Sequence, residues 1–322
     1  MELGKTDGLS INDLLKSINC SYATLEKALK LLHLDGAITK QKSIFHRTPN
    51  PWQANYARYN AVTLVRRQEL AKMQEYVRTK ECLMAFLARE LSDPFARVCG
   101  RCANCSKPSL PDKVIDHQIT LAAIKFLKRD HPVIMPRKQW PAGFQIGEKR
   151  AIPVEWQNRE GRALCNYGDA GWGRLVARGK YRDHRFADEL VAAAAQLIQQ
   201  EWRPDPFPRF IAAVPSLRAS TLVRDFAQRL ADMLHLKFVE ILAKTKETPP
   251  QKQMANSAQQ AANVLSAFKV VGNVPAGPCL LLDDIFDSRW TLTITGFLIA
   301  QRGGGPVFPF ALAKAADRKL LE

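Results

Sequence analysis

The 322-residue sequence lacks any hydrophobic run that could cross a membrane, because no stretch approaches the roughly 20 consecutive apolar residues of a membrane helix. The N-terminus MELGKTDGLS also lacks the apolar segment of a signal peptide, so we expect a cytoplasmic protein without membrane contact. Acidic residues are few, with 31 Asp and Glu against 47 Lys and Arg. Residues 1–150 hold 25 of the basic and 14 of the acidic residues, which favours this half as the part that binds a polyanion.

A complete ATP-binding phosphate loop is also missing. GKT at 4–6 matches only the end of such a loop, which needs a glycine five residues before the Gly-Lys pair and a preceding strand. Any ATPase motor, with its ATP and Mg²⁺, is therefore expected on sequence that is not included here. The abrupt start at a helix-turn-helix pattern suggests a fragment.

Residues 1–50 follow the order helix, turn, helix, hairpin, which predicts a winged helix. Ser10 and Asp13 form a capping-box pattern at the first helix, and Ser21 caps a second helix that Gly36 ends before the strand-like AIT and SIF. The basic side chains expected to face DNA phosphates are Lys27, Lys30, Lys40, Lys42 and Arg47. The alternatives are a helical domain with solvated lysines, or a winged helix that contacts proteins.

Seven cysteines make an odd count, which argues against a disulfide framework. Four of them cluster in the sequence, with CGRCANC at 99–105 and one more at the start of an apolar helix. These predicted ligands are Cys82, Cys99, Cys102 and Cys105. Four thiolates suit structural zinc, and an iron–sulfur cluster is the alternative with the same ligands. The segment 51–110 is therefore predicted to be a small helical zinc-binding module.

The spacing C-x16-C-x2-C-x2-C, preceded by the basic helix RRQELAKMQEYVRTKEC, resembles the zinc-binding subdomain of RecQ-family DNA helicases. In that family a winged helix usually follows the zinc module, whereas here it comes first. The inverted order resembles the RecQ-like branch that carries a phosphoribosyltransferase-like domain at its C-terminus. The resemblance implies DNA as a partner, in the form of a duplex, a fork or a single-stranded junction. Two interpretations remain open for the basic helix: its charged side chains face DNA, or they form a solvated surface. These side chains are Arg66, Arg67, Lys72 and Arg78.

Beyond a helical and Pro-rich connector at 111–145, residues 146–322 alternate helical and strand-like segments. FADELVAAAAQLIQQEW and LVRDFAQRLADMLH have helical patterns, whereas FIAAVP, KFVEIL and CLLLDD are strand-like. Such alternation predicts an α/β domain with a parallel sheet covered on both faces. Ligands of these sheets bind beyond the carboxyl ends of the strands, where DDIFDSRWT falls.

The strand-DDxxxSxxT-helix arrangement resembles the ribosyl-phosphate signature of type I phosphoribosyltransferases. AAVPSLR is similar to the pyrophosphate loop of that family, and TPPQKQMANSAQQAANVLSAF resembles the flexible segment of its ComF-like members. The resemblance implies that the first two aspartates hold a ribose and that the following turn wraps a phosphate. By position the residues are Asp283, Asp284, Asp287, Ser288, Arg289 and Thr291.

Arg289 stands where the family loops usually have glycine. Its bulk would block the phosphate cradle, or its guanidinium would itself bind a phosphate. The domain is accordingly a transferase, a ligand sensor or a DNA-holding platform. We expect this chain to be the C-terminal DNA-binding and accessory region of a RecQ-like ATP-dependent 3'-5' DNA helicase that acts in DNA repair or recombination. The second hypothesis is a zinc-containing phosphoribosyltransferase regulated by, or fused to, a winged-helix module.

Overall fold

The computed structural model describes residues 3, 8–106, 116–216, 221–249 and 253–315. GKT at 4–6, the end of AAVPSLR and residues 250–252 of the ComF-like segment lie outside them. The chain forms two compact units, one made of Met1–Pro49 with Thr120–Glu322 and the other of Asn50–Ile119. None of the described helices has both the length and the apolar character needed to cross a membrane.

The N-terminal part of the first unit packs two helices on a three-stranded sheet of order β1-β3-β2. Its elements are β1 (Leu9–Ser10), α1 (Ile11–Ser17), α2 (Tyr22–Leu34), β2 (Ile38–Gln41) and β3 (Ile44–Arg47). The predicted caps are confirmed, because the Ser10 hydroxyl accepts from the Asp13 N–H and the Ser21 hydroxyl accepts from Thr24. Leucines of both helices and Phe45 form the small core. We call this part, residues 8–49, the front module.

The larger part of the first unit is built on a six-stranded sheet of order β4-β5-β11-β10-β6-β7. All neighbouring strands are parallel except β4, which is antiparallel to β5 at the edge. The strands are β4 (Val133–Ile134), β5 (Gly161–Asn166), β6 (Phe210–Ala213), β7 (Lys237–Phe238), β10 (Gly277–Phe286) and β11 (Gly304–Lys314). The coarse expectation of an α/β domain with a mostly parallel sheet is confirmed.

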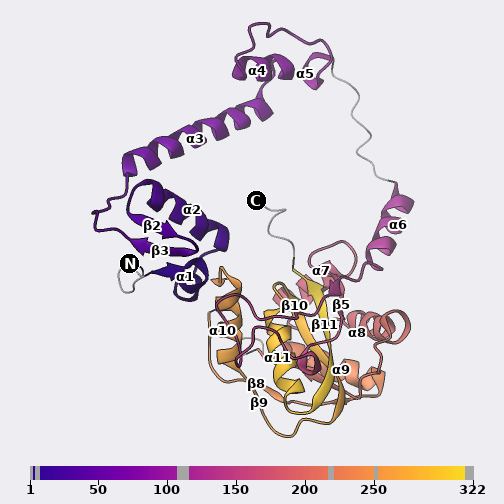
Figure 1. Ribbon diagram of the computed structural model, residues 1–322. Helices are drawn as coiled ribbons and strands as arrows, with labels where there is room; N and C mark the ends of the chain where they lie inside the picture. Colours follow the sequence, from indigo (N-terminus) through magenta and orange to yellow (C-terminus); the bar gives the residue numbers. More distant parts are fainter. Residues whose placement is uncertain (1–2, 4–7, 107–115, 217–220, 250–252, 316–322) are drawn as a thin grey trace. The chain divides into compact units, whose positions relative to one another are not determined.

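Helices cover both faces of this sheet (Figure 1). One face packs on α7 (Gly173–Arg178), α8 (Asp188–Gln196) and α9 (Leu222–Leu234), and the other on α10 (Ser257–Ala267), α11 (Trp290–Ala300) and the two-stranded β8 (Leu242–Lys244) and β9 (Phe268–Val270). The π-helical turns Gly179–Asp183 and Leu197–Trp202 continue α7 and α8, and a 3-10 turn spans Val154–Trp156. Alternating residues of β10 serve the two faces, with Leu280 and Leu282 on the α9 side and Cys279 and Leu281 on the α11 side.

The segment expected to be a connector contributes to this core. It holds α6 (His117–Leu127) and β4, and its Trp140 is only 1% exposed. The Trp140 ring lies edge-on against Phe144 and Phe297, with ring centroids 5.9 and 5.0 Å away. Such aromatic contacts add to burial of the ring, so this segment is part of the sheet domain's packing.

Two asparagines join the front module to the start of α10. Asn19 donates to the Gln253 carbonyl and accepts from the Ala255 N–H, at 2.9 and 2.8 Å. The Nδ2 of Asn256 donates to the carbonyls of Leu15, Ile18 and Cys20 at 3.2 to 3.3 Å. These are carbonyls at and just beyond the end of α1, which have no partner within that helix.

A second contact with α1 comes from a glycine of the loop after Trp140. Gly143 has φ +84, and a Cβ added there would lie 2.9 Å from the Asn12 carbonyl oxygen. Both the backbone conformation and the close approach therefore require glycine. The front module is thus held at the α1–α2 turn and along α1.

The second unit contains α3 (Tyr56–Arg78), α4 (Leu83–Glu90) and α5 (Ala103–Ser106). Asn55 caps α3 by accepting from the Arg58 N–H at 3.0 Å. No residue of α3 is buried in the described structure, and even its apolar side chains Met73 and Val77 are highly exposed. Tyr76 contacts Phe86 of α4, with ring centroids 5.7 Å apart.

Candidate functional site

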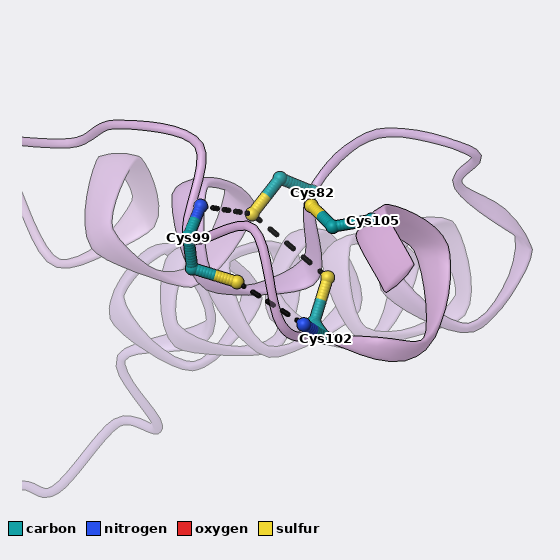
Figure 2. A group of neighbouring side chains, drawn as sticks. All are labelled: Cys82, Cys99, Cys102 and Cys105. Atoms are coloured by element: carbon teal, nitrogen blue, oxygen red, sulfur yellow. Dashed lines mark hydrogen bonds between the residues drawn. The ribbon is translucent and has the colours of Figure 1, made fainter. Parts of the chain in front are cut away.

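The four predicted metal ligands come together in the second unit. Cys82 caps α4, Cys99 and Cys102 lie in the loop that follows this helix, and Cys105 lies in α5 (Figure 2). Their Sγ atoms all lie within 4.8 Å of one another, and those of Cys82 and Cys102 are 3.9 Å apart. Four thiolates at 2.3 Å from a tetrahedral metal would be separated by about 3.8 Å. The arrangement therefore can hold a metal ion.

Backbone N–H groups converge on these sulfurs. The Sγ of Cys82 accepts from the N–H of Cys99 at 3.2 Å, and the Sγ of Cys99 accepts from the N–H of Cys102 at 3.3 Å (Figure 2). The first of these bonds lowers the pKa of the Cys82 thiol. Burial opposes ionisation of Cys102, but the N–H of Leu83 and the neighbouring thiol of Cys105 outweigh it and lower its pKa to about 6. Thiolates, not thiols, are the form that binds metals.

An asparagine that the sequence analysis did not single out holds the site together. The Nδ2 of Asn104, in α5, donates to the carbonyls of Thr79 and Glu81 at 2.9 and 2.7 Å. Asn104 lies between Cys102 and Cys105, and the carbonyls precede Cys82. These bonds fix the two ends of the ligand set against each other.

The basic residues of α3 are partly engaged with acids. Arg66 pairs with Glu69 at 2.7 Å, and Lys72 lies 3.2 Å from Glu75 and 3.1 Å from Glu90. These pairs are exposed, so each stabilises the helix little. They nevertheless reduce the free positive charge of this face.

The basic residues predicted to meet DNA lie on α2, on the β2–β3 hairpin and at the end of β3, and all are exposed. They are Lys27, Lys30, Lys40, Lys42 and Arg47. Only Lys30 has a carboxylate within 4.0 Å among the described residues, that of Glu26 on the same helix. The docking contacts described above involve α1 and the α1–α2 turn, so they leave this basic surface uncovered.

The two predicted ribose acids lie near the end of β10, and consecutive residues of a strand point to opposite faces. Asp284 lies on the α7 side, where its Oδ2 is 2.7 Å from the Nζ of Lys180. Burial opposes protonation of Lys180, but the charge of Asp284 outweighs it and raises its pKa. Burial, followed by the charge of Asp284, raises the pKa of Asp283 to about 8. Lys180 therefore offers its charge to Asp284, and burial disfavours the ionised form of Asp283.

The predicted phosphate loop runs from Asp287, which is exposed, through Ser288 and Arg289 into α11, where Thr291 lies. Arg289 has φ +69 and ψ −1, the left-handed conformation that glycine adopts without strain. Its Nη1 donates to the Met135 carbonyl at 3.1 Å. Among the described residues, no side-chain hydrogen bond caps the start of α11.

Comparison with protein-family models finds no match to this chain, and a search of curated proteins finds no relative.

Two residues of these sites were not predicted from the sequence: Lys180, which pairs with Asp284, and Arg137, which contacts the loop. Arg137 donates to the Ser288 carbonyl from Nε and Nη2, at 3.2 and 2.7 Å, and its guanidinium lies 4.0 Å from the centre of the Trp290 ring. Neither residue belongs to a motif, so no spacing pattern could have found it. The one available signal was composition, because residues 120–150 hold seven basic and two acidic side chains.

Proposed function

We propose that this chain is a DNA-binding accessory region, corresponding to the C-terminal part of a RecQ-like ATP-dependent DNA helicase. The observation that carries the proposal is the way the front module docks. Its contacts use α1 and the α1–α2 turn, and they leave the face of α2 and the β2–β3 hairpin in solvent. In a winged helix these are the elements that meet a duplex.

The charge on this surface suits phosphate contacts. Among the described residues, Lys27, Lys40, Lys42 and Arg47 have no carboxylate within 4.0 Å, so their charge is available to a polyanion. Base-reading side chains are not evident, so we expect binding that depends on salt and discriminates little between sequences.

The cysteine cluster acts in this proposal as a structural zinc site. Its closed set of four sulfurs leaves no open position for a substrate, which fits a stabilising metal better than a catalytic one. An iron–sulfur cluster has the same ligands. Reduced thiols of this kind are typical of the cytoplasm, so a cytoplasmic location belongs to the proposal.

The sheet domain acts in this proposal as a platform that binds DNA or a phosphoribosyl ligand without turnover. The ion pair of Lys180 with Asp284 occupies one of the two carboxylates that a ribose would need. The side chain of Arg289 is bonded to the Met135 carbonyl, next to the loop that would close around a phosphate. Both contacts weigh against a phosphoribosyltransferase.

Fluorescence anisotropy with fork, duplex and single-stranded DNA across a salt series tests the proposal. The double variant Lys40→Gln, Lys42→Gln should weaken binding of the preferred DNA, and it should reduce the slope of log K against log salt by about 2, because each phosphate contact contributes about 0.9. Lys237→Gln, which removes an exposed charge from strand β7, is the matched control and should change neither.

Absence of DNA binding at low salt would refute the proposal, as would equal behaviour of the double variant and the control. Calorimetry with phosphoribosyl diphosphate and Mg²⁺ addresses the alternative enzyme. Tight binding followed by release of diphosphate with a nucleobase would favour that alternative.

A further inference from the structure

A pocket of about 470 Å³ lies beside the start of α11 and is lined by four basic side chains. We call it the arginine pocket, and its polar and aromatic lining consists mainly of Arg137, Lys138, Arg150, Arg289, Trp140 and Trp290. Asp283 and Asp284 do not line it, so it differs from the predicted ribose site.

Each arginine of the pocket is anchored by its guanidinium to a backbone carbonyl. Arg137 donates to the Ser288 carbonyl at 2.7 Å, Arg289 to Met135 at 3.1 Å and the Nε of Arg150 to Trp140 at 3.1 Å. A guanidinium has five N–H donors, so each arginine retains donors for a ligand. Anchoring also reduces the entropy that each side chain would lose on binding.

The positive charge of the pocket is not balanced by acids. In the described parts of the chain, no carboxylate lies within 4.0 Å of the charged groups of Arg137, Lys138, Arg150 or Arg289. Burial and then repulsion by Arg289 lower the pKa of Arg137 to about 10, which still leaves it charged at neutral pH. Clustered cations without counter-charges favour a bound anion.

Two residues that line the pocket also carry buried donors without an acceptor among the described residues. The indole N–H groups of Trp140 and Trp290 are buried without a hydrogen-bond partner among the described residues, and both side chains are 1% exposed. Leaving a buried donor unpaired costs about 1–3 kcal/mol. An acceptor in the pocket that reached either indole would offset this cost.

We propose that the arginine pocket binds a ligand through two or more phosphate groups. Guanidinium forks match phosphate oxygens in geometry, and four cations suit a multiply charged anion better than a single carboxylate. The volume lies within the range of ligand pockets, so it admits a diphosphate or adjacent phosphates of a nucleic acid strand.

The position of the pocket makes both sources of phosphate reasonable. Ala142 and Ser257 line it, and each is next in sequence to a residue that contacts the front module, Gly143 and Asn256. The pocket therefore lies beside the contacts that hold the front module, in the same compact unit as the basic surface of that module. A free nucleotide would need only the pocket itself.

Calorimetry with inorganic pyrophosphate and anisotropy with a single-stranded oligonucleotide separate the two sources, using the full chain. Arg289→Gln and Arg150→Gln should each lower the affinity for the probe that binds by roughly tenfold or more, because hydrogen bonds to charged groups are strong. Arg302→Gln is the matched control, since it removes an equal charge just beyond the other end of α11, about 16 Å along the helix. It should leave affinity unchanged.

If pyrophosphate binds and the pocket variants weaken this binding, the ligand is a free diphosphate. If only the oligonucleotide binds and the pocket variants weaken its binding, the pocket holds backbone phosphates. If neither probe binds, or if the pocket variants behave like Arg302→Gln, the proposal is refuted. Lys138→Gln, which alters an exposed side chain, gives the same test if an arginine variant unfolds. The Lys40→Gln, Lys42→Gln variant should leave pyrophosphate binding unchanged, which separates failure of this site from failure of the front module.

Discussion

Replacing Asn256 with alanine should loosen the front module and fray the start of α10 together. The Oδ1 of Asn256 accepts from the Gln259 N–H at 2.9 Å, and loss of such a cap costs about 1 kcal/mol. Its Nδ2 donates to the carbonyls of Leu15, Ile18 and Cys20. The Ile18 carbonyl also accepts from the Cys20 N–H, but loss of the buried bond to the Leu15 carbonyl costs about 1–3 kcal/mol more. The total of roughly 2–4 kcal/mol is a large part of the stability of an ordinary domain.

Hydrogen exchange measured by mass spectrometry on the full chain resolves the two effects. In Asn256→Ala, amides of α1 and of the first turn of α10 should exchange roughly thirtyfold faster or more, the equivalent of about 2 kcal/mol. Asn256→Asp keeps the capping oxygen and loses the Nδ2 donor. Amides of α10 should therefore exchange as slowly as in the wild type, whereas amides of α1 should exchange faster. Asn55→Ala removes only a cap, that of α3, and is the control for capping alone.

Unchanged exchange of α1 in Asn256→Ala would refute the docking described here. Equal exchange of α1 in Asn256→Asp and wild type would show that the donor contributes nothing.

Three other substitutions test the metal site, the acid pair and the second docking contact. Cys102→Ser should lower metal content in elemental analysis and open residues 50–119 to protease, because metal binding contributes folding energy; full metal content with unchanged digestion would contradict this. Asp283 has a pKa of about 8 in the folded state and about 3.9 when unfolded, so between these values the folded state binds a proton that the unfolded state does not. The free energy of unfolding of the wild type should therefore fall as pH rises through this range. Urea midpoints compared at pH 5 and 8 should show this loss in the wild type and not in Asp283→Asn. Gly143→Ala should speed exchange of α1 more than Gly147→Ala, because both positions have positive φ but only the former has neighbours within 4 Å.

Local signals in the sequence predicted much of the chain's local structure. The caps at Ser10 and Ser21, the strand CLLLDD and the cysteine spacing each depend on neighbouring residues, and the structure contains all of them. Strands β5 and β11 were not predicted from the sequence. Residues 248–268, which resemble the flexible segment of the ComF-like members, include helix α10 at 257–267 with four buried residues.

Long-range contacts explain the remaining differences. The burial of Trp140, the ion pair of Lys180 with Asp284 and the hydrogen bonds of Asn256 join residues that are far apart in the sequence. A Pro-rich stretch such as HPVIMPRKQWPAG looks like a linker unless the aromatic partner of its tryptophan is known. Sequence patterns describe periodicity and capping, and they carry no information on which distant surface a side chain meets.

The unit Asn50–Ile119 is inserted between two stretches that fold together, since Met1–Pro49 and Thr120–Glu322 form one compact body. A backbone break inside the inserted unit would therefore divide the chain into two polypeptides, but the contacts between Met1–Pro49 and Thr120–Glu322 would remain. Two polypeptides, each ending or starting within the insertion, should reassemble through the asparagine contacts when mixed. The protein should therefore be suitable for split-protein complementation. The site of the break decides whether the four cysteines stay on one polypeptide or are divided between two.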